Sequence, residues 1–305
     1  MFAGIRNASA LFASILQVPL RHPAMLGPLL LAWCVFAPVT VYLYFYFPWS
    51  ETGFWTGSAV LFGALFLISY VVSLANFVLL EQIRMVESGS AAELLWPIRV
   101  AVSNSLRALH VTLIWAILWF LISLAEAILS PKGDDQRSDE PDPEAVARLL
   151  SGAQGGSLSN VFFDALKQGV RMLAFLVYPA VAWERDRRPL RRGLAVALAH
   201  RAEFAAGFGL AWMAAGVVFL PPALVFMLSE QTDVPFPDWV WFAVILYSGF
   251  AWSFSILVEQ LFTAELYLWD MKWREACAAE GAPALKLGDV PRPSIMDDVS
   301  EFKTG

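Results

Sequence analysis

The hydrophobic positions of the chain gather into long runs instead of alternating with polar ones. A helix needs about 20 apolar residues to cross the hydrocarbon core of a bilayer, because every buried backbone group must find its partner inside the helix. Runs of this length with few charges therefore predict membrane-spanning helices. Such runs occur at residues 25–47, 57–80, 108–130, 204–229 and 239–261.

One further run, the fourth in chain order, has two possible lengths. Its charge-free part, 172–183, is too short to cross, whereas an extension back to residue 161 is long enough but brings in Asp164, Lys167 and Arg171. These residues follow one another at i, i+3 and i+7, so they form one stripe on a helix whose other faces are apolar. A charge at mid-bilayer costs about 2.5–3.5 kcal/mol. We therefore expect a span over 161–183, with the stripe in its outer half and facing protein or water.

The fifth run carries two further signals. Pro221 and Pro222 remove two backbone donors and predict a bend near the outer end of the helix. Upstream, Gly207, Ala211 and Ala215 form a small-residue stripe at four-residue spacing, which favours close packing against another helix. That neighbour is expected to belong to the same chain, with a dimer partner as the alternative.

Composition supports the membrane class. Of the 305 residues, 58% are hydrophobic and 16% are charged, and the mean hydropathy is +0.58, so the chain is far more apolar than a soluble domain. The formal net charge is -6, but basic and acidic residues fall in different connections, so this total carries little information. We expect no nucleic-acid partner.

The charges of the connections predict the topology. Arginines concentrate after the second and fourth runs, at 84–107 and 185–192, whereas the other connections are mostly acidic. Because Lys and Arg favour the cytoplasmic side, we expect six spans in the inner (cytoplasmic) membrane of a cell, with the N- and C-termini cytoplasmic. The expected all-α organisation is an interfacial segment at 1–24, a six-span bundle with interfacial amphipathic helices at 25–273, its extracytoplasmic loop at 131–160, and a cytoplasmic, largely disordered tail at 274–305.

Two parts of the chain follow the same order of features: a span, a glutamate at its inner edge, a basic amphipathic stretch and a second span. Glu81 and Glu184 occupy the glutamate position, and LLEQI at 79–83 recurs as LVEQL at 257–261. An internal duplication accounts for these short matches, and so does the general similarity of apolar helices.

Charged residues within the spans are candidates for a polar path. Glu126, near the outer end of the third span, joins Asp164, Lys167 and Arg171. Intramembrane charges are functional candidates by default. The alternative is that these side chains pair with one another or with headgroups at the interface.

Acidic residues also recur at the inner ends of the spans. Glu81, Glu184, Glu259 and Glu265 all take such positions, and Glu259 is followed by further apolar residues that could place it within the membrane plane. A carboxylate there could couple a proton or a cation. Solvation at the boundary explains the same placement.

The segment RDRRPLRR concentrates positive charge on one connection. Each basic residue near an anionic leaflet contributes roughly 1 kcal/mol to surface attraction. Contact with membrane lipids, anionic headgroups above all, is therefore one reading, orientation of the chain is the second, and a protein partner at the cytoplasmic face is the third. The arginines concerned are Arg185, Arg187, Arg188, Arg191 and Arg192.

Motifs of catalysis and metal binding are missing from the sequence. It contains no HExxH, no Cys/His cluster, no GxSxG elbow, no Walker loop and no GxGxxG. Cys34 and Cys277 are too far apart in sequence to form a disulfide framework. We therefore expect no catalytic residues, no cofactor and no metal.

The exit of the fourth run, FLVYPAVAWERDRRPLRRGLAVA at 175–197, and the late segment LFTAELYLWD at 261–270 resemble the six-span bacterial inner-membrane proteins grouped as domains of unknown function. The resemblance covers most of the membrane part and implies no chemistry. In overall layout the chain is also similar, more weakly, to six-span sulfate-permease-like proteins.

The sequence thus favours a non-enzymatic scaffold or accessory component of the membrane, which contacts lipid or a partner through its basic inner connections. The alternative is a small-solute or ion transporter with a polar path near Glu126, Asp164, Lys167 and Arg171.

Overall fold

A computed structural model describes residues 18–48, 51–129, 158–232, 236–280 and 287–290. Within these ranges the chain is helical and contains no strand, which confirms the all-α prediction. The longer helices are α3 (Gly27–Val41), α4 (Phe54–Glu87), α5 (Leu95–Arg107), α6 (Leu109–Leu129), α8 (Leu158–Pro179), α9 (Pro189–Ala199), α10 (Arg201–Val218), α11 (Leu220–Thr232) and α12 (Asp238–Glu280). Short elements are α2 (Val18–Arg21), the 3-10 turns η1 (Pro23–Leu26) and η5 (Leu287–Asp289), and the π-turns η2 (Tyr42–Tyr46) and η4 (Ala180–Glu184).

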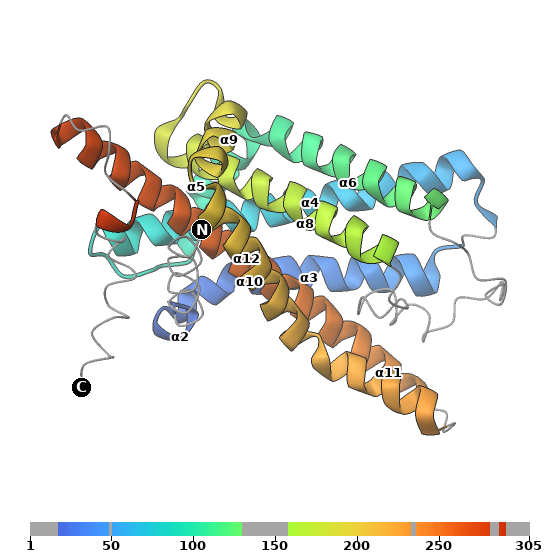
Figure 1. Cartoon of the computed structure of the whole chain (residues 1–305). Helices are drawn as coiled ribbons and strands as arrows, with labels where there is room; N and C mark the ends of the chain where they lie inside the picture. The colour runs from blue at the N-terminus through green and yellow to red at the C-terminus, as the bar shows by residue number, and fades with distance from the viewer. Residues whose placement is uncertain (1–17, 49–50, 130–157, 233–235, 281–286, 291–305) are drawn as a thin grey trace, which may run out of the picture.

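The long helices form one elongated bundle (Figure 1). Helices α3, α4, α6 and α8 lie alongside one another, and α12, with α10 packed on it, crosses them at an angle and contacts α3 and α8. Helices α2, α5 and α9 gather at one end of the bundle together with the second half of α12. We call this the basic end, because the arginine-rich connections at 84–107 and 185–192 lie there.

The helices are those of a multi-pass membrane protein. Three of them are long and apolar enough to cross a bilayer, at Pro23–Val41, Trp55–Glu87 and Trp239–Ala279. Two bent pairs raise the number to five if each pair is one span: α5 with α6, at 69°, and α9 with α10, at 91°. Helix α8, which carries the charged stripe, is not counted among them.

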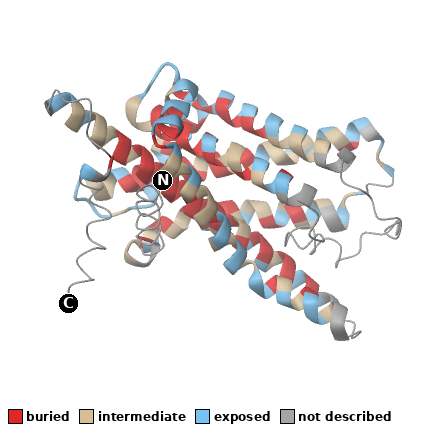
Figure 2. Cartoon of the chain, in the orientation of Figure 1, coloured by how far each residue is buried: buried red, intermediate tan, exposed pale blue. Residues whose placement is uncertain are grey.

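The outward faces of these helices are apolar, as contact with lipid requires. Large exposed side chains follow α6, among them Leu113, Ile117 and Leu121, and α10, among them Trp212 and Met213. Figure 2 shows exposed positions along the outer faces of the long helices and buried positions concentrated where the helices meet. Contiguous apolar surface of this kind marks a membrane or an interface.

The fifth run is interrupted close to the expected place. Helix α10 ends at Val218, and α11 begins at Leu220 with Pro221 and Pro222 in its first turn. The small-residue stripe is confirmed as a packing surface within the chain, because a Cβ atom on Gly207 would lie 1.9 Å from Cζ of Phe262 in α12. Only a glycine allows α10 to approach α12 this closely.

The last helix extends well beyond the last expected span. Residues 274–280, which begin the part expected as a cytoplasmic, largely disordered tail, are helical and belong to α12. Beyond them Leu287 and Val290 are buried, and Nε1 of Trp269 donates to the carbonyl oxygen of Val290 at 3.2 Å. Because the tail is rich in prolines and charged residues, its sequence does not indicate this short packed segment. Residues 281–286 and 291–305, most of the 1–24 segment and most of the 131–160 loop lie outside the described residues.

Candidate functional site

A deeply buried ion pair joins two residues that the sequence singles out separately. Arg171 of α8 donates from Nε to Oε2 of Glu259 and from Nη2 to Oε1, both at 2.6 Å. The Arg171 side chain is 12% exposed and that of Glu259 is 0% exposed, and the guanidinium also lies over the ring of Trp252, 6.0 Å from its centroid. A bidentate pair of this kind neutralises two charges that neither helix could bury alone.

The rest of the charged stripe lies nearer the start of α8 and is less buried. Lys167 and Asp164 form an ion pair of 3.8 Å, with side chains 20% and 56% exposed. Helix α6 includes Glu126, but the side chain of this residue lies outside the described part of the structure. The structure therefore divides the stripe into a half-exposed pair within α8 and the buried pair of Arg171 with Glu259.

A cluster of hydroxyl groups lies between three helices near the centre of the bundle. The Ser73 hydroxyl of α4 is 2.8 Å from Oγ1 of Thr112 in α6 and 2.5 Å from the Tyr178 hydroxyl of α8. All three side chains are buried. This cluster was not predicted from the sequence, because isolated hydroxyls within apolar runs give no charge signal. Ser69, Ser73 and Asn76, at i, i+4 and i+7 on α4, were the pattern that could have indicated it.

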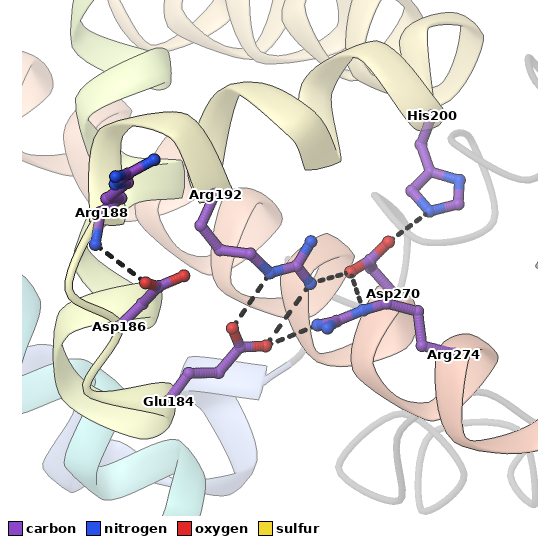
Figure 3. Close-up of polar contacts among 7 residues, drawn as sticks. All are labelled: Glu184, Asp186, Arg188, Arg192, His200, Asp270 and Arg274. Carbon is purple, nitrogen blue, oxygen red and sulfur yellow. Dashed lines mark hydrogen bonds and ion pairs between the residues drawn. The ribbon is translucent and has the colours of Figure 1, made fainter. Parts of the chain in front are cut away.

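A network of charged side chains ties three elements together at the basic end (Figure 3). Arg192 of α9 donates to Glu184 of η4 at 3.0 Å and to Asp270 of α12 at 2.5 Å. Arg274 donates to the same two carboxylates, at 2.5 Å and 2.9 Å, and Nε2 of His200 lies 2.9 Å from Oδ1 of Asp270. Asp270, which is 1% exposed, thus joins α9 to α12 through Arg192 and His200.

The protonation of Arg192 follows from this network. Burial disfavours the charged guanidinium, but the hydrogen bond to Asp270 and the negative charges of Asp270 and Glu184 outweigh burial, so the pKa of Arg192 is raised. Helix α9 is therefore held in place by a permanent cation. Of this network only Glu184 and Arg192 were predicted from the sequence. The contacts of Asp270 and Arg274 depend on α12 continuing past the expected end of the last span, and that of His200 depends on Asp270.

The arginine cluster divides into two parts. Arg192 is turned inward to the network, whereas the other four arginines are exposed: Arg185, Arg187, Arg188 and Arg191. Arg185 has a left-handed backbone, with φ of 52°, which ends η4 and turns the chain toward α9. The backbone N–H of Arg188 donates to Oδ1 of Asp186 at 2.8 Å and stabilises this turn. The turn exposes Arg185, Arg187 and Arg188, and Arg191 follows them in the first turn of α9.

Both short helices at the basic end, α5 and α9, expose apolar residues beside basic ones. Leu190, Leu194 and Leu198 are exposed on α9, next to the exposed arginines. On α5 the exposed apolar side chains are Leu95, Trp96, Val102 and Leu106, and the exposed basic ones are Arg99 and Arg107. An exposed apolar stripe flanked by arginines is typical of helices that lie in the plane of a membrane interface.

The fold and these surfaces define a helical, multi-pass membrane protein with amphipathic helices at one end. Comparisons with protein-family models, with curated proteins and with solved structures found no match. The residues that the structure describes contain no group of three or more His, Cys, Asp or Glu side chains that could hold a metal ion. Cys34 and Cys277 are free thiols.

Proposed function

We propose that this protein is a non-enzymatic scaffold or accessory component of a bacterial inner membrane, which holds α5 and α9 in a layer of anionic lipid headgroups at its cytoplasmic face. The observation that carries the proposal is the fixed position of α9. Its inward arginine is bound by Glu184 and Asp270, while its leucines and the neighbouring arginines remain exposed. A helix anchored in this way presents a preformed surface to lipid.

A topology of six spans fits this proposal. Six spans result when α6, α8 and α10 are added to the three long apolar helices, which leaves α5 and α9 outside the spans. The cost of placing Arg171 in the membrane is offset by its bidentate pairing with Glu259. The chain then has both termini on the side of the basic end, and the positive-inside tendency assigns that side to the cytoplasm.

The expected strength of lipid contact follows from the charges. Each exposed arginine near an anionic surface contributes about 1 kcal/mol before screening, and burial of the exposed leucines at the interface adds a hydrophobic contribution. The surface is therefore expected to enrich anionic lipids around the protein without selecting one headgroup. A cytosolic protein with an acidic face would compete for the same arginines.

Neutralising the four exposed arginines together, by Arg→Gln at positions 185, 187, 188 and 191, should strongly reduce this enrichment. The measurement is retention of phosphatidylglycerol over phosphatidylcholine after extraction from mixed nanodiscs, by native mass spectrometry. The Arg→Lys variant at the same four positions keeps the charge and should retain the preference. Equal retention by the Gln variant and the unchanged protein would overturn the proposal.

The buried pair of Arg171 and Glu259 supports a second candidate function, transport of a small solute or an ion. The pair and the hydroxyl cluster of Ser73, Thr112 and Tyr178 together supply polar groups within the bundle. Transport requires water to reach the pair. Hydroxyl-radical footprinting of Trp252, the ring beside Arg171, tests this, because a protected ring means a dry pair and removes the support for transport.

A further inference from the structure

Glu265 stands apart from the other buried acids of the bundle. Its residue is 1% exposed, and neither carboxylate oxygen has a hydrogen-bond partner among the described residues. By contrast, Glu81, Glu259 and Asp270 each accept a hydrogen bond from an arginine. An ionised carboxylate that is buried without a partner is very costly, and such groups usually become neutral instead.

The charged groups around Glu265 do not offer compensation. Glu87 of α4 acts electrostatically against ionisation of Glu265, and Lys272 of α12 acts in favour of it. Nζ of Lys272 lies 3.3 Å from Oε2 of Glu87, so the positive charge of Lys272 mainly compensates the carboxylate of Glu87. Further charged or titratable groups of the surrounding elements are Arg84 and Glu81 on α4, Glu184 on η4, Arg192 on α9, His200 directly after α9, Glu259, Asp270, Arg274 and Glu275 on α12, and Asp289 on η5.

The position of Glu265 along α12 places it close to the basic end. At about 1.5 Å per residue, Glu265 lies roughly 39 Å along the helix from Trp239, whereas the hydrocarbon core is about 30 Å thick. The carboxyl group is therefore near the interface and enclosed by protein. A pocket of about 240 Å³ opens at this end, lined by Ile83, Arg84, Glu87, Trp183, Leu268 and Met271, and Leu268 lies three residues after Glu265 on α12. Glu87 thus contacts the pocket and also acts electrostatically on Glu265.

The sequence repeats this arrangement on two helices. The match between LLEQI and LVEQL extends further, since Glu81–Gln82 of α4 is followed by Glu87 at the same spacing as Glu265 follows Glu259–Gln260 of α12. Glu87 and Glu265 hold equivalent positions in the two segments. The recurrence gives each of these two contacting helices a carboxyl group at the corresponding position, and only that of Glu87 has a cationic partner in the described structure.

We infer that Glu265 is a proton-binding site: its carboxyl group is protonated and neutral in the folded protein, and it exchanges its proton with the solution at the basic end by way of Glu87 and the adjacent pocket. This site is separate from the lipid-contacting surface of α5 and α9, so it does not depend on the proposed function. Protonation removes the charge that burial penalises, while Glu87 keeps its ion pair with Lys272. A bound monovalent cation in place of the proton is the competing outcome.

The pH dependence of unfolding tests the site. A carboxyl group that is protonated when folded and ionised when unfolded binds one more proton in the folded state, so the protein loses stability as the pH rises until the folded-state group itself ionises. The unfolding equilibrium constant in mixed micelles should therefore increase by up to about tenfold per pH unit between pH 5 and pH 7. Glu265→Gln, which mimics the neutral form, should remove this dependence. Glu275→Gln, at an exposed position of the same helix, should retain it.

Infrared spectroscopy provides the second measurement, which keeps the test valid if Glu265→Gln fails to fold. The spectrum of the unchanged protein should contain a carbonyl band of a protonated carboxylic acid that shifts in ²H₂O and remains in Glu87→Gln. Two results would overturn the inference: the absence of such a band at pH 6, or a pH dependence that sodium chloride suppresses and choline chloride does not. The second result would assign a sodium ion to the site.

Discussion

Replacing Arg171 by methionine should lower the free energy of unfolding by about 3–5 kcal/mol, because it leaves the fully buried carboxylate of Glu259 without its counter-charge. The Arg171 guanidinium donates two hydrogen bonds to the Glu259 carboxylate, each at 2.6 Å. Methionine fills much of the same volume, so the loss measures the uncompensated charge more than a cavity. Reversible unfolding in mixed micelles gives the free energy.

A double variant separates charge from packing at this site. Arg171→Met with Glu259→Leu removes both charges and should recover most of the stability lost in Arg171→Met, since replacement of a buried ion pair by apolar residues is often neutral. Lys167→Met is the matched control on the same helix face. Its partner Asp164 is 56% exposed, so the expected loss is below about 1 kcal/mol. Equal losses for the two single variants would contradict the buried-pair interpretation.

Replacing Asp270 by alanine should release α9 from the end of the bundle. Asp270 accepts hydrogen bonds from Arg192 and Arg274 and lies within hydrogen-bond distance of His200. Because Asp270, Arg192 and His200 are largely buried and both arginines are permanent cations, a loss of about 3 kcal/mol is expected. Hydrogen exchange of the α9 backbone should rise strongly, while exchange in the middle of α4 changes little.

Asp186→Ala is the control for Asp270. It removes a carboxylate from the same end of the protein, but Asp186 is exposed and accepts only a backbone N–H in the described structure. We expect its effect on stability to stay within about 0.5 kcal/mol. If Asp270→Ala left the exchange of α9 unchanged, α9 would be held by its apolar contacts with α8 and not by the charged network.

The apolar runs predicted the helices well because the length of a run is a local property of the sequence. The expected spans at 57–80 and 108–130 correspond to α4 and α6. The proline pair at Pro221 predicted the interruption near Phe219 for the same reason, since a missing backbone donor acts within one turn. The end of the last span could not be read in this way. Helix α12 continues beyond 261 through residues that pack against η4, α9 and η5, and that support is tertiary.

In the candidate site, too, local sequence patterns identified residues but not their tertiary contacts. Arg171 and Glu259 were each recognised as charges within apolar runs, but their pairing depends on α8 lying against α12, which no local pattern encodes. Arg192 was grouped with four other arginines by its position in the sequence, although its side chain turns inward to Asp270. The contacts of Ser73 with Tyr178 gave no signal at all, because a hydroxyl changes the hydropathy of a run very little.

Cysteine labelling tests most directly whether the basic end faces the cytoplasm. In a background of Cys34→Ser and Cys277→Ser, single cysteines are placed at the two exposed positions Glu51 and Ser90, and spheroplasts are treated with a membrane-impermeant maleimide before and after permeabilisation. The account predicts that Glu51→Cys reacts in intact spheroplasts and that Ser90→Cys, between α4 and α5, reacts only after permeabilisation. Labelling of both positions from the same side, or of Ser90→Cys alone in intact spheroplasts, would contradict it.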